Sequence, residues 1–176
     1  MRGCGALAAC AVLVAGAAAA QDVLQDPPRL APGSDANAHR AWAARYLQQD
    51  DWTIAGFVNG GFWLVSSEIS PHNHYPTVQD WVRIEQAGPL NPQLPNASAL
   101  WQTEVDCSKS AYRTLRYINY RYNNLRGAVL GDRTDDKATF ITPPPQSVGD
   151  AVVQAICKDA ASGAPPSASA PAEGGQ

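Results

Sequence analysis

Two cysteines, Cys107 and Cys157, place the strongest constraint on how this chain can fold. The other two cysteines lie within the first ten residues, in a stretch that has the pattern of an export signal. An even pair of cysteines in an exported chain favours a disulfide, because compartments outside the cytoplasm are oxidising. Closing a loop of about 50 residues would stabilise the fold by roughly 4 kcal/mol. Two buried free thiols are the alternative.

The export signal is predicted over residues 1–20. A single arginine is followed by a short apolar core and by a run of alanines that ends at Ala20. The apolar run is shorter than the roughly 20 residues that span a bilayer. Residues 7–10 also fit a lipoprotein cleavage box, but few apolar residues would precede that site. We expect cleavage after Ala20 and a periplasmic or secreted protein, with an outer-membrane lipoprotein anchored at Cys10 as the alternative.

Composition divides the rest of the chain into three parts. We expect a flexible arm over 21–34, one folded domain over 35–159 and a disordered tail over 160–176. The arm and the tail are rich in proline and small residues and lack hydrophobic periodicity. The net charge of −3 gives no electrostatic reason to expect nucleic acid or an acidic lipid surface as a partner. No transmembrane segment is expected.

The first elements of the domain are predicted from capping and turn residues. A helix should begin at Ser34 or Asp35, either of which can cap it, and run to Gln48. Two apolar runs then follow, separated by Asn59 and Gly60. Asn-Gly favours a tight hairpin turn because both residues tolerate positive φ. The two runs, residues 52–58 and 61–67, are therefore predicted to form a β-hairpin.

Further strands are indicated by alternating apolar and polar residues. The clearest is 99–107, in which Cys107 shares a face with Trp101 and Val105, so the thiol should lie on the core side. Residues 132–137 have the composition of a charged turn. The other predicted strands are 77–86, 111–120, 126–131 and a short one at 138–141.

The last predicted element is an amphipathic helix that begins at Ser147. Its apolar residues sweep one broad arc, with Cys157 at the margin beside Val153. Strands joined by short turns and followed by one helix indicate an α+β fold. We therefore predict an antiparallel β-sheet of about six strands, with the C-terminal α-helix packed on one face and tethered by a Cys107–Cys157 bridge.

The sequence contains no evident catalytic constellation. His72 and His74 could place two imidazoles on one side of an extended segment, but no third metal ligand is apparent and a solvated turn explains them better. There is no Gly-x-Ser-x-Gly nucleophile motif, no Cys-x-x-Cys pair and no phosphate-binding loop. We expect no metal, no cofactor and no enzymatic activity. An enzyme assembled from distant residues is the third reading of function.

One candidate for partner binding is a strand rich in tyrosine and arginine. Tyr112, Arg113, Arg116 and Tyr117 follow one another closely in an otherwise acidic chain. A basic, aromatic surface can bind a protein, an anionic polymer or single-stranded nucleic acid. Of these, nucleic acid is the least expected partner of an exported protein, and we expect none. A solvated strand face explains the same pattern, and we favour that explanation.

A second candidate is a pair of tryptophans. Trp63 and Trp81 fall on the parity opposite to their apolar neighbours, such as Leu64 and Val82. If the C-terminal helix covers one face of the sheet, both tryptophans should lie on the other face. There they are either covered by the N-terminal helix through Trp42 or form an exposed apolar patch of the kind found at interfaces.

Residues 101–157 resemble the surface-adhesin protein E-like family of Gram-negative bacteria. The resemblance rests on four motifs: Val105-Asp106-Cys107, Tyr112-Arg113, Ser147-Val148-Gly149 and Cys157. It implies an antiparallel sheet with a C-terminal helix tethered by a disulfide. For the founding type of the family, it also implies a surface lipoprotein that adheres to host cells and extracellular-matrix proteins.

These patterns predict an exported, non-enzymatic binding module of adhesin-like character. It would hold an extracellular-matrix or envelope protein through an exposed sheet face or through the Tyr/Arg-rich hairpin. A structural or assembly factor of the bacterial cell envelope is the alternative. A homodimer is compatible with the sequence.

Overall fold

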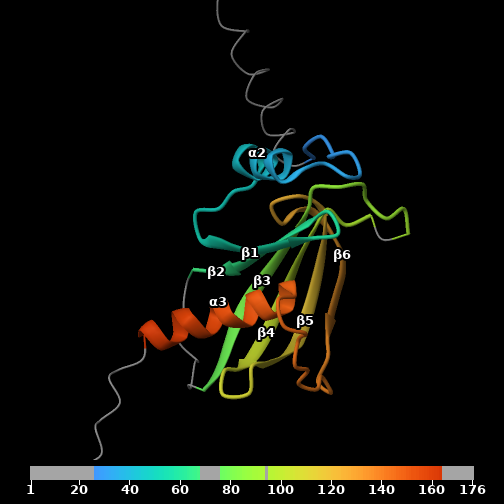
Figure 1. The fold of residues 1–176 in the computed structure, drawn as a ribbon. Helices are drawn as coiled ribbons and strands as arrows, with labels where there is room; N and C mark the ends of the chain where they lie inside the picture. Colours follow the sequence, from blue (N-terminus) through green and yellow to red (C-terminus); the bar gives the residue numbers. More distant parts are fainter. Residues whose placement is uncertain (1–25, 68–75, 94, 164–176) are drawn as a thin grey trace, which may run out of the picture.

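The computed structural model describes residues 26–67, 76–93 and 95–163. Its centre is a six-stranded antiparallel sheet in the order β1-β2-β3-β4-β5-β6, so each strand pairs with its neighbour in sequence. Two helices, α2 (Ala36–Tyr46) and α3 (Val148–Gly163), accompany the sheet (Figure 1). The strands are β1 (Trp52–Val58), β2 (Gly61–Ser66), β3 (Thr77–Gln86), β4 (Ser98–Asp106), β5 (Ala111–Tyr122) and β6 (Arg126–Thr134). The predicted fold class is confirmed.

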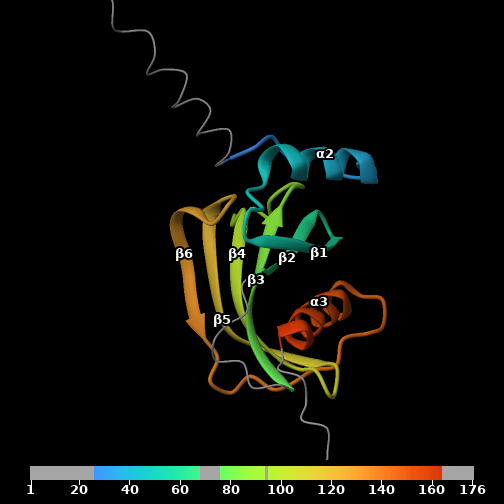
Figure 2. The same ribbon diagram turned by 90° about the vertical axis from the view of Figure 1, so that its left-hand side faces the viewer.

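The sheet curls so that the two helices lie on different faces of it. Figure 2 shows β1 and β2 turned away from the direction of β4–β6, with α2 above this hairpin and α3 below it. Helix α3 contacts β1, β2, β3 and β4. The curl follows from the right-handed twist that accumulates along an antiparallel sheet. The strand order makes β1 and β6 the two edge strands.

Local sequence signals set the first elements as expected. The Asn59-Gly60 turn joins β1 to β2, and both residues have positive φ, 51° and 78°. Helix α2 begins after Asp35, whose carboxylate accepts a hydrogen bond from the backbone N–H of Ala38 at 2.8 Å. Of the two expected caps, the structure uses Asp35. The predicted hairpin and N-terminal helix are therefore confirmed.

The main hydrophobic core lies between α3 and the sheet. Four valines of the strands meet Val152, Val153 and Ile156 of the helix, and these seven side chains are at most 3 % exposed. Burying Val152, Val153 and Ile156 stabilises the docked helix by roughly 4 to 9 kcal/mol in total. The strand residues are Val65, Val78, Val82 and Val105.

A second core lies on the opposite face of the β1–β2 hairpin, beneath α2. Trp42 stacks on Phe62 with ring centroids 5.9 Å apart. Leu64 is fully buried beside them, and Tyr46 and Leu47 also belong to the cluster. Strand β2 is thus buried on both of its faces.

Two boundaries at the C-terminal side of the sheet differ from the predictions. Strand β6 runs on to Thr134 where a charged turn was expected, because Asp132 and Arg133 continue the ladder with β5. Charged residues are tolerated there since β6 is an edge strand with one side in water. The predicted strand at 138–141 is reduced to a single bridge between Ile141 and Tyr112.

Helix α3 also differs in its end. It continues to Gly163, four residues beyond the expected end of the domain at 159. The extension follows from packing, since Ala160 is buried in the main core.

Within the described ranges no helix is long and apolar enough to cross a membrane. The expected signal peptide and the pair His72 and His74 lie outside the described residues.

Candidate functional site

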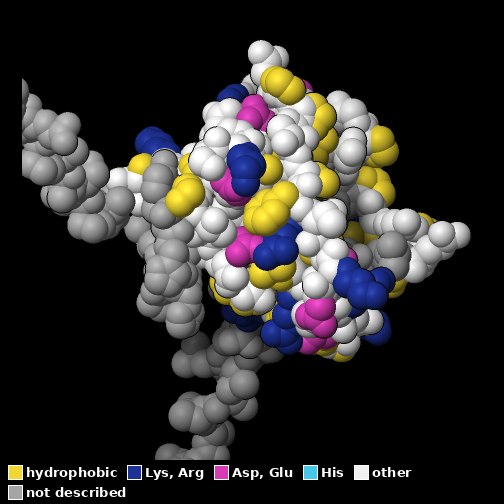
Figure 3. Space-filling view, turned by 90° about the horizontal axis from the view of Figure 1, so that it is seen from below, with side chains coloured by type: hydrophobic (Ala, Val, Ile, Leu, Met, Phe, Trp, Pro, Cys, Tyr) yellow, Lys and Arg dark blue, Asp and Glu magenta, His cyan; other side chains and the backbone are white. Residues whose placement is uncertain are grey.

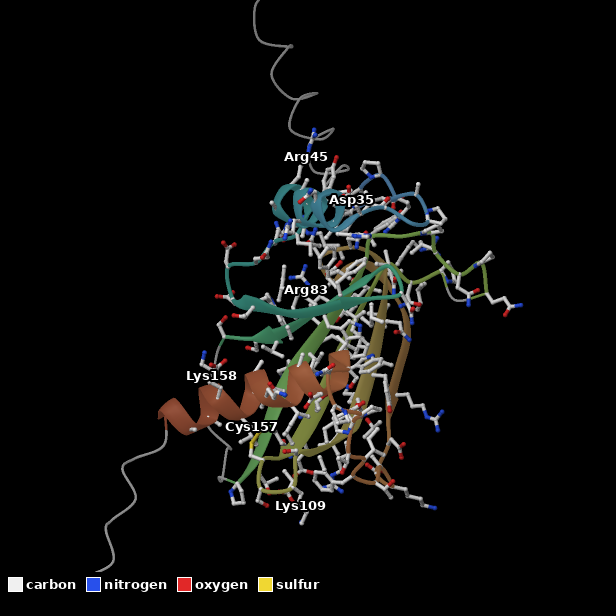
Figure 4. The ribbon with its side chains drawn as sticks, viewed as in Figure 1. Asp35, Arg45, Arg83, Lys109, Cys157 and Lys158 are labelled. Carbon is white, nitrogen blue, oxygen red and sulfur yellow. A yellow bond between two sulfur atoms is a disulfide. The ribbon has the colours of Figure 1, made fainter. Side chains whose placement is uncertain are left out.

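The predicted disulfide joins Cys107 to Cys157, with Cα atoms 5.6 Å apart. Cys107 lies just past the end of β4, and Cys157 lies in the C-terminal half of α3 (Figure 4). Both side chains pack against the main core. The bridge thus fastens the helix to one face of the sheet, and this prediction is confirmed.

Trp63 and Trp81 lie on opposite faces of the sheet, which corrects the expectation that they share the face away from α3. Trp63 pairs with Ile84 across β2 and β3 and packs against the main core. Its ring meets Trp101 edge-on at 5.0 Å. Trp81 pairs with Gln102 on the side turned away from α3. Parity failed here because β2 is apolar on both faces.

The Tyr/Arg-rich strand β5 also divides between the two faces. Tyr112 packs against the main core near α3, and burial raises the pKa of its hydroxyl. Tyr117 meets Trp101 edge-on at 5.4 Å on the same side. Arg113 and Arg116 point to the other side, where each pairs across the sheet with a residue of β4. The tyrosines and arginines therefore do not form one continuous surface.

The side of β3–β6 turned away from α3 is the best candidate for a binding surface, and we call it the open face. In Figure 2 no described helix lies against this side of β4–β6. Its side chains are half-buried, neither packed in a core nor fully solvated. The open face consists of Trp81, Leu100, Gln102, Glu104, Arg113 and Arg116.

Ion pairs neutralise the arginines of the open face. Arg113 pairs with Glu104, and its guanidinium also lies over the ring of Phe140 at 4.8 Å. Arg116 donates two hydrogen bonds to Asp132, at 2.8 and 2.6 Å, and these bonds lower the pKa of the Asp132 carboxyl. In Figure 3, which views the lower end of the molecule, Lys and Arg side chains lie beside Asp and Glu side chains. The open face is therefore amphipathic and carries charges of both signs.

A buried polar network lies near α2, and sequence reasoning missed it. Glu85 is fully buried, and its carboxylate accepts hydrogen bonds from Arg83 Nε at 2.6 Å and from Asn123 Nδ2 at 2.7 Å. The backbone N–H of Asn124 donates to the same carboxylate at 2.9 Å. Burial raises the pKa of Glu85, and the positive charge of Arg83 opposes that shift. Each of these hydrogen bonds has the Glu85 carboxylate as acceptor, which suits its ionised form.

The network holds three parts of the chain together. Arg83, labelled beneath α2 in Figure 4, donates to the carbonyl of Gln48 at 2.7 Å, just after the helix. Asn124 donates to the carbonyl of Tyr46 at 2.9 Å from the turn between β5 and β6. By alternation, Arg83 and Glu85 lie on the side of β3 opposite to Val82 and Ile84, and the pattern does not indicate that this side is buried. The consecutive asparagines Asn123 and Asn124 indicate a turn, but they do not indicate the buried hydrogen bonds that both side chains make.

No group of three residues suited to hold a metal ion occurs in the described part of the chain. The structure offers two features that a partner could use: the open face, and an apolar groove between α2 and β1.

Comparison with known proteins gives one family. The family described as Surface-adhesin protein E matches residues 61–158. Crystal form II of Haemophilus influenzae protein E aligns at 17 % identity with a TM-score of 0.49, covering 75 % of this chain and 97 % of the other. Protein E from non-typeable Haemophilus influenzae aligns at 15 % identity with a TM-score of 0.49, covering 77 % and 86 %. No curated protein matches the sequence.

Proposed function

The chain belongs to the surface-adhesin protein E family, and we propose that it is an exported, adhesin-like module that binds a protein partner through its open face. The family match over residues 61–158 is the observation that carries this proposal. Export is supported by the signal pattern of residues 1–20 and by the disulfide, which suits an oxidising compartment. In this proposal the protein binds its partner non-covalently and catalyses no reaction.

The composition of the open face supports a protein as the partner. Protein interfaces combine an apolar centre with a polar rim and are enriched in Trp and Arg. Trp81 and Leu100 supply apolar surface, and the Glu104–Arg113 and Arg116–Asp132 pairs border it. A nucleic acid or another anionic polymer would need unpaired cations, and both arginines are already paired.

Position in the fold supports the same surface. The disulfide and the main core hold α3 on the other side of the sheet, so binding at the open face needs no movement of the helix. A rigid scaffold keeps the side chains of the face in place before the partner arrives. Preorganisation of this kind reduces the entropy that binding costs.

Binding of the mature protein to immobilised extracellular-matrix proteins and to envelope extracts tests the proposal. Trp81→Ala should weaken binding at least tenfold, as expected for a central aromatic side chain. Arg133→Ala is the matched control, because Arg133 lies on the opposite side of the sheet in the exposed edge strand β6 and should change binding less than twofold. Equal binding by wild type and Trp81→Ala would refute the open face as the binding surface.

The source of the partner separates adhesion from the alternative. Capture of a matrix protein supports an adhesin-like role. Capture of envelope components alone would indicate a structural or assembly factor of the cell envelope. Turnover of a captured molecule would contradict a non-enzymatic module.

A further inference from the structure

An apolar groove of about 540 Å³ lies between α2 and the edge strand β1, away from the open face. A volume of this size is within the range of small-molecule sites. The helix contributes a wall with several alanine side chains, including Ala43 and Ala44. The strands contribute Ile54, Phe57 and Phe62.

The groove exposes large apolar side chains. Ile54 is 38 % exposed and Phe57 is 37 % exposed, although both lie on an edge strand. The Phe57 ring lies 4.7 Å from the Phe62 ring and 3.9 Å from the His39 ring, so the three rings form one continuous aromatic side of the groove. Exposed apolar surface on an edge strand is costly and commonly marks a site that a ligand or partner covers.

The charge of the groove is positive. Its polar lining consists of His39, Arg40 and Gln49, and no carboxylate lines it. Arg40 is exposed, donates a hydrogen bond to the neutral Asn37, and makes no ion pair with any residue that the structure describes. The nearby Asp35 uses its carboxylate to cap α2. One unpaired cation at the rim of an apolar groove complements a ligand with one anionic group and an apolar body.

We propose that this groove binds a fatty acid, with the carboxylate at Arg40 and the alkyl chain between the alanine wall and Phe57. The part of α2 that lines the groove, Ala36 to Ala44, is about 12 Å long at 1.5 Å per residue. An extended alkyl chain of about ten carbons covers that length, given carbon–carbon bonds of about 1.5 Å. The guanidinium can bind the carboxylate with two parallel hydrogen bonds. This site is separate from the proposed protein-binding face.

Fluorescence of 11-(dansylamino)undecanoic acid, added below its micellar concentration to the mature protein, tests the site. Laurate should displace the probe, and dodecyltrimethylammonium at the same concentration should not. Shortening the competitor from ten to eight carbons, both of which fit the length of the groove, should weaken its binding roughly fifteenfold, because each buried methylene contributes about fourfold.

Two pairs of variants locate the site. Ala44→Trp should fill the groove and reduce probe affinity at least tenfold, whereas Ala41→Trp, an exposed position of α2 outside the groove, should leave it unchanged. Arg40→Gln should weaken laurate about fivefold to tenfold, and Arg45→Gln, on the same helix but outside the groove, should not.

Three outcomes would overturn the proposal. They are no binding of the probe, equal affinity in Ala44→Trp and wild type, and equal displacement by the cationic amphiphile. Matching thermal unfolding of Ala44→Trp and Ala41→Trp would show that a loss of binding reflects the groove and not the fold. The result does not depend on whether the open face binds a protein.

Discussion

Removing the disulfide should weaken the fold without releasing α3. The double substitution Cys107→Ala/Cys157→Ala opens a loop whose ends are separated by 50 positions in the sequence. The chain-entropy relation assigns such a loop about 4 kcal/mol at 25 °C. Set against a total stability of about 5–15 kcal/mol, this is a large loss. The free energy of unfolding should fall by about that amount.

The helix should stay docked because its packing is independent of the bridge. Val152, Val153 and Ile156 remain buried against the sheet, and their burial contributes roughly 4 to 9 kcal/mol. Urea unfolding followed by tryptophan fluorescence measures the change. With a slope of about 2 kcal/mol per molar urea, the midpoint should fall by about 2 M. Wild-type protein kept reduced provides the matched control and should behave like the variant.

Two results would refute this reasoning. A loss smaller than about 1 kcal/mol would mean that the bridge does not constrain the unfolded chain as the loop length implies. A loss of helical circular dichroism in the variant before any urea is added would mean that packing alone does not hold α3. Unchanged helical signal with a lower midpoint is the predicted result.

Three further substitutions test buried groups. Glu85→Ala should cost about 3–5 kcal/mol in urea unfolding, because it leaves a buried arginine without its partner. Burial raises the pKa of the Asp80 carboxyl to about 7, so between pH 4 and pH 7 the folded state binds a proton that the unfolded state has released. The free energy of unfolding should therefore fall as the pH rises from about 4 to about 7. At pH 8, Asp80→Asn should be more stable than wild type by on the order of 2 kcal/mol, after allowance for the partial exposure of Asp80. Thr103→Val should be neutral or gain about 1 kcal/mol, because the buried Thr103 hydroxyl has no hydrogen-bond partner in the described part of the chain.

Each of these predictions has a control. Asp132→Ala, in the exposed ion pair with Arg116, should cost far less than Glu85→Ala, and an equal cost for Glu85 and Asp132 would contradict the buried network. An equal difference in stability between Asp80→Asn and wild type at pH 4 and pH 8 would contradict the raised pKa. A loss of stability in Thr103→Val would show that its hydroxyl is not an unsatisfied group.

Much of the fold could be predicted from local sequence. Alternation marked β3 to its terminal residues and β4 to within one residue, because apolar and polar residue types largely alternate along both strands. The Asn59-Gly60 turn and the Asp35 cap are set by backbone preferences of single residues. These signals depend on neighbours in sequence, so the chain alone contains them.

The arrangement of the candidate site could not be predicted in the same way. The face of Trp63 depends on α2 and α3 burying opposite sides of β2, which is a tertiary contact. The burial of Arg83 and Glu85 depends on the end of α2 meeting a turn near Asn124. The groove also exists only because α2 packs beside β1. Alternation describes one strand and carries no information on what covers each face.

Photo-crosslinking from single positions tests the central claim most directly. A photoreactive amino acid at position 102, within the open face, is compared with one at position 158, on the exposed side of α3, with an immobilised matrix protein as the partner. Gln102 and Lys158 are the natural residues at these positions. The open face as the binding surface predicts a covalent adduct from position 102 and none from position 158. An adduct from position 158 alone would contradict it.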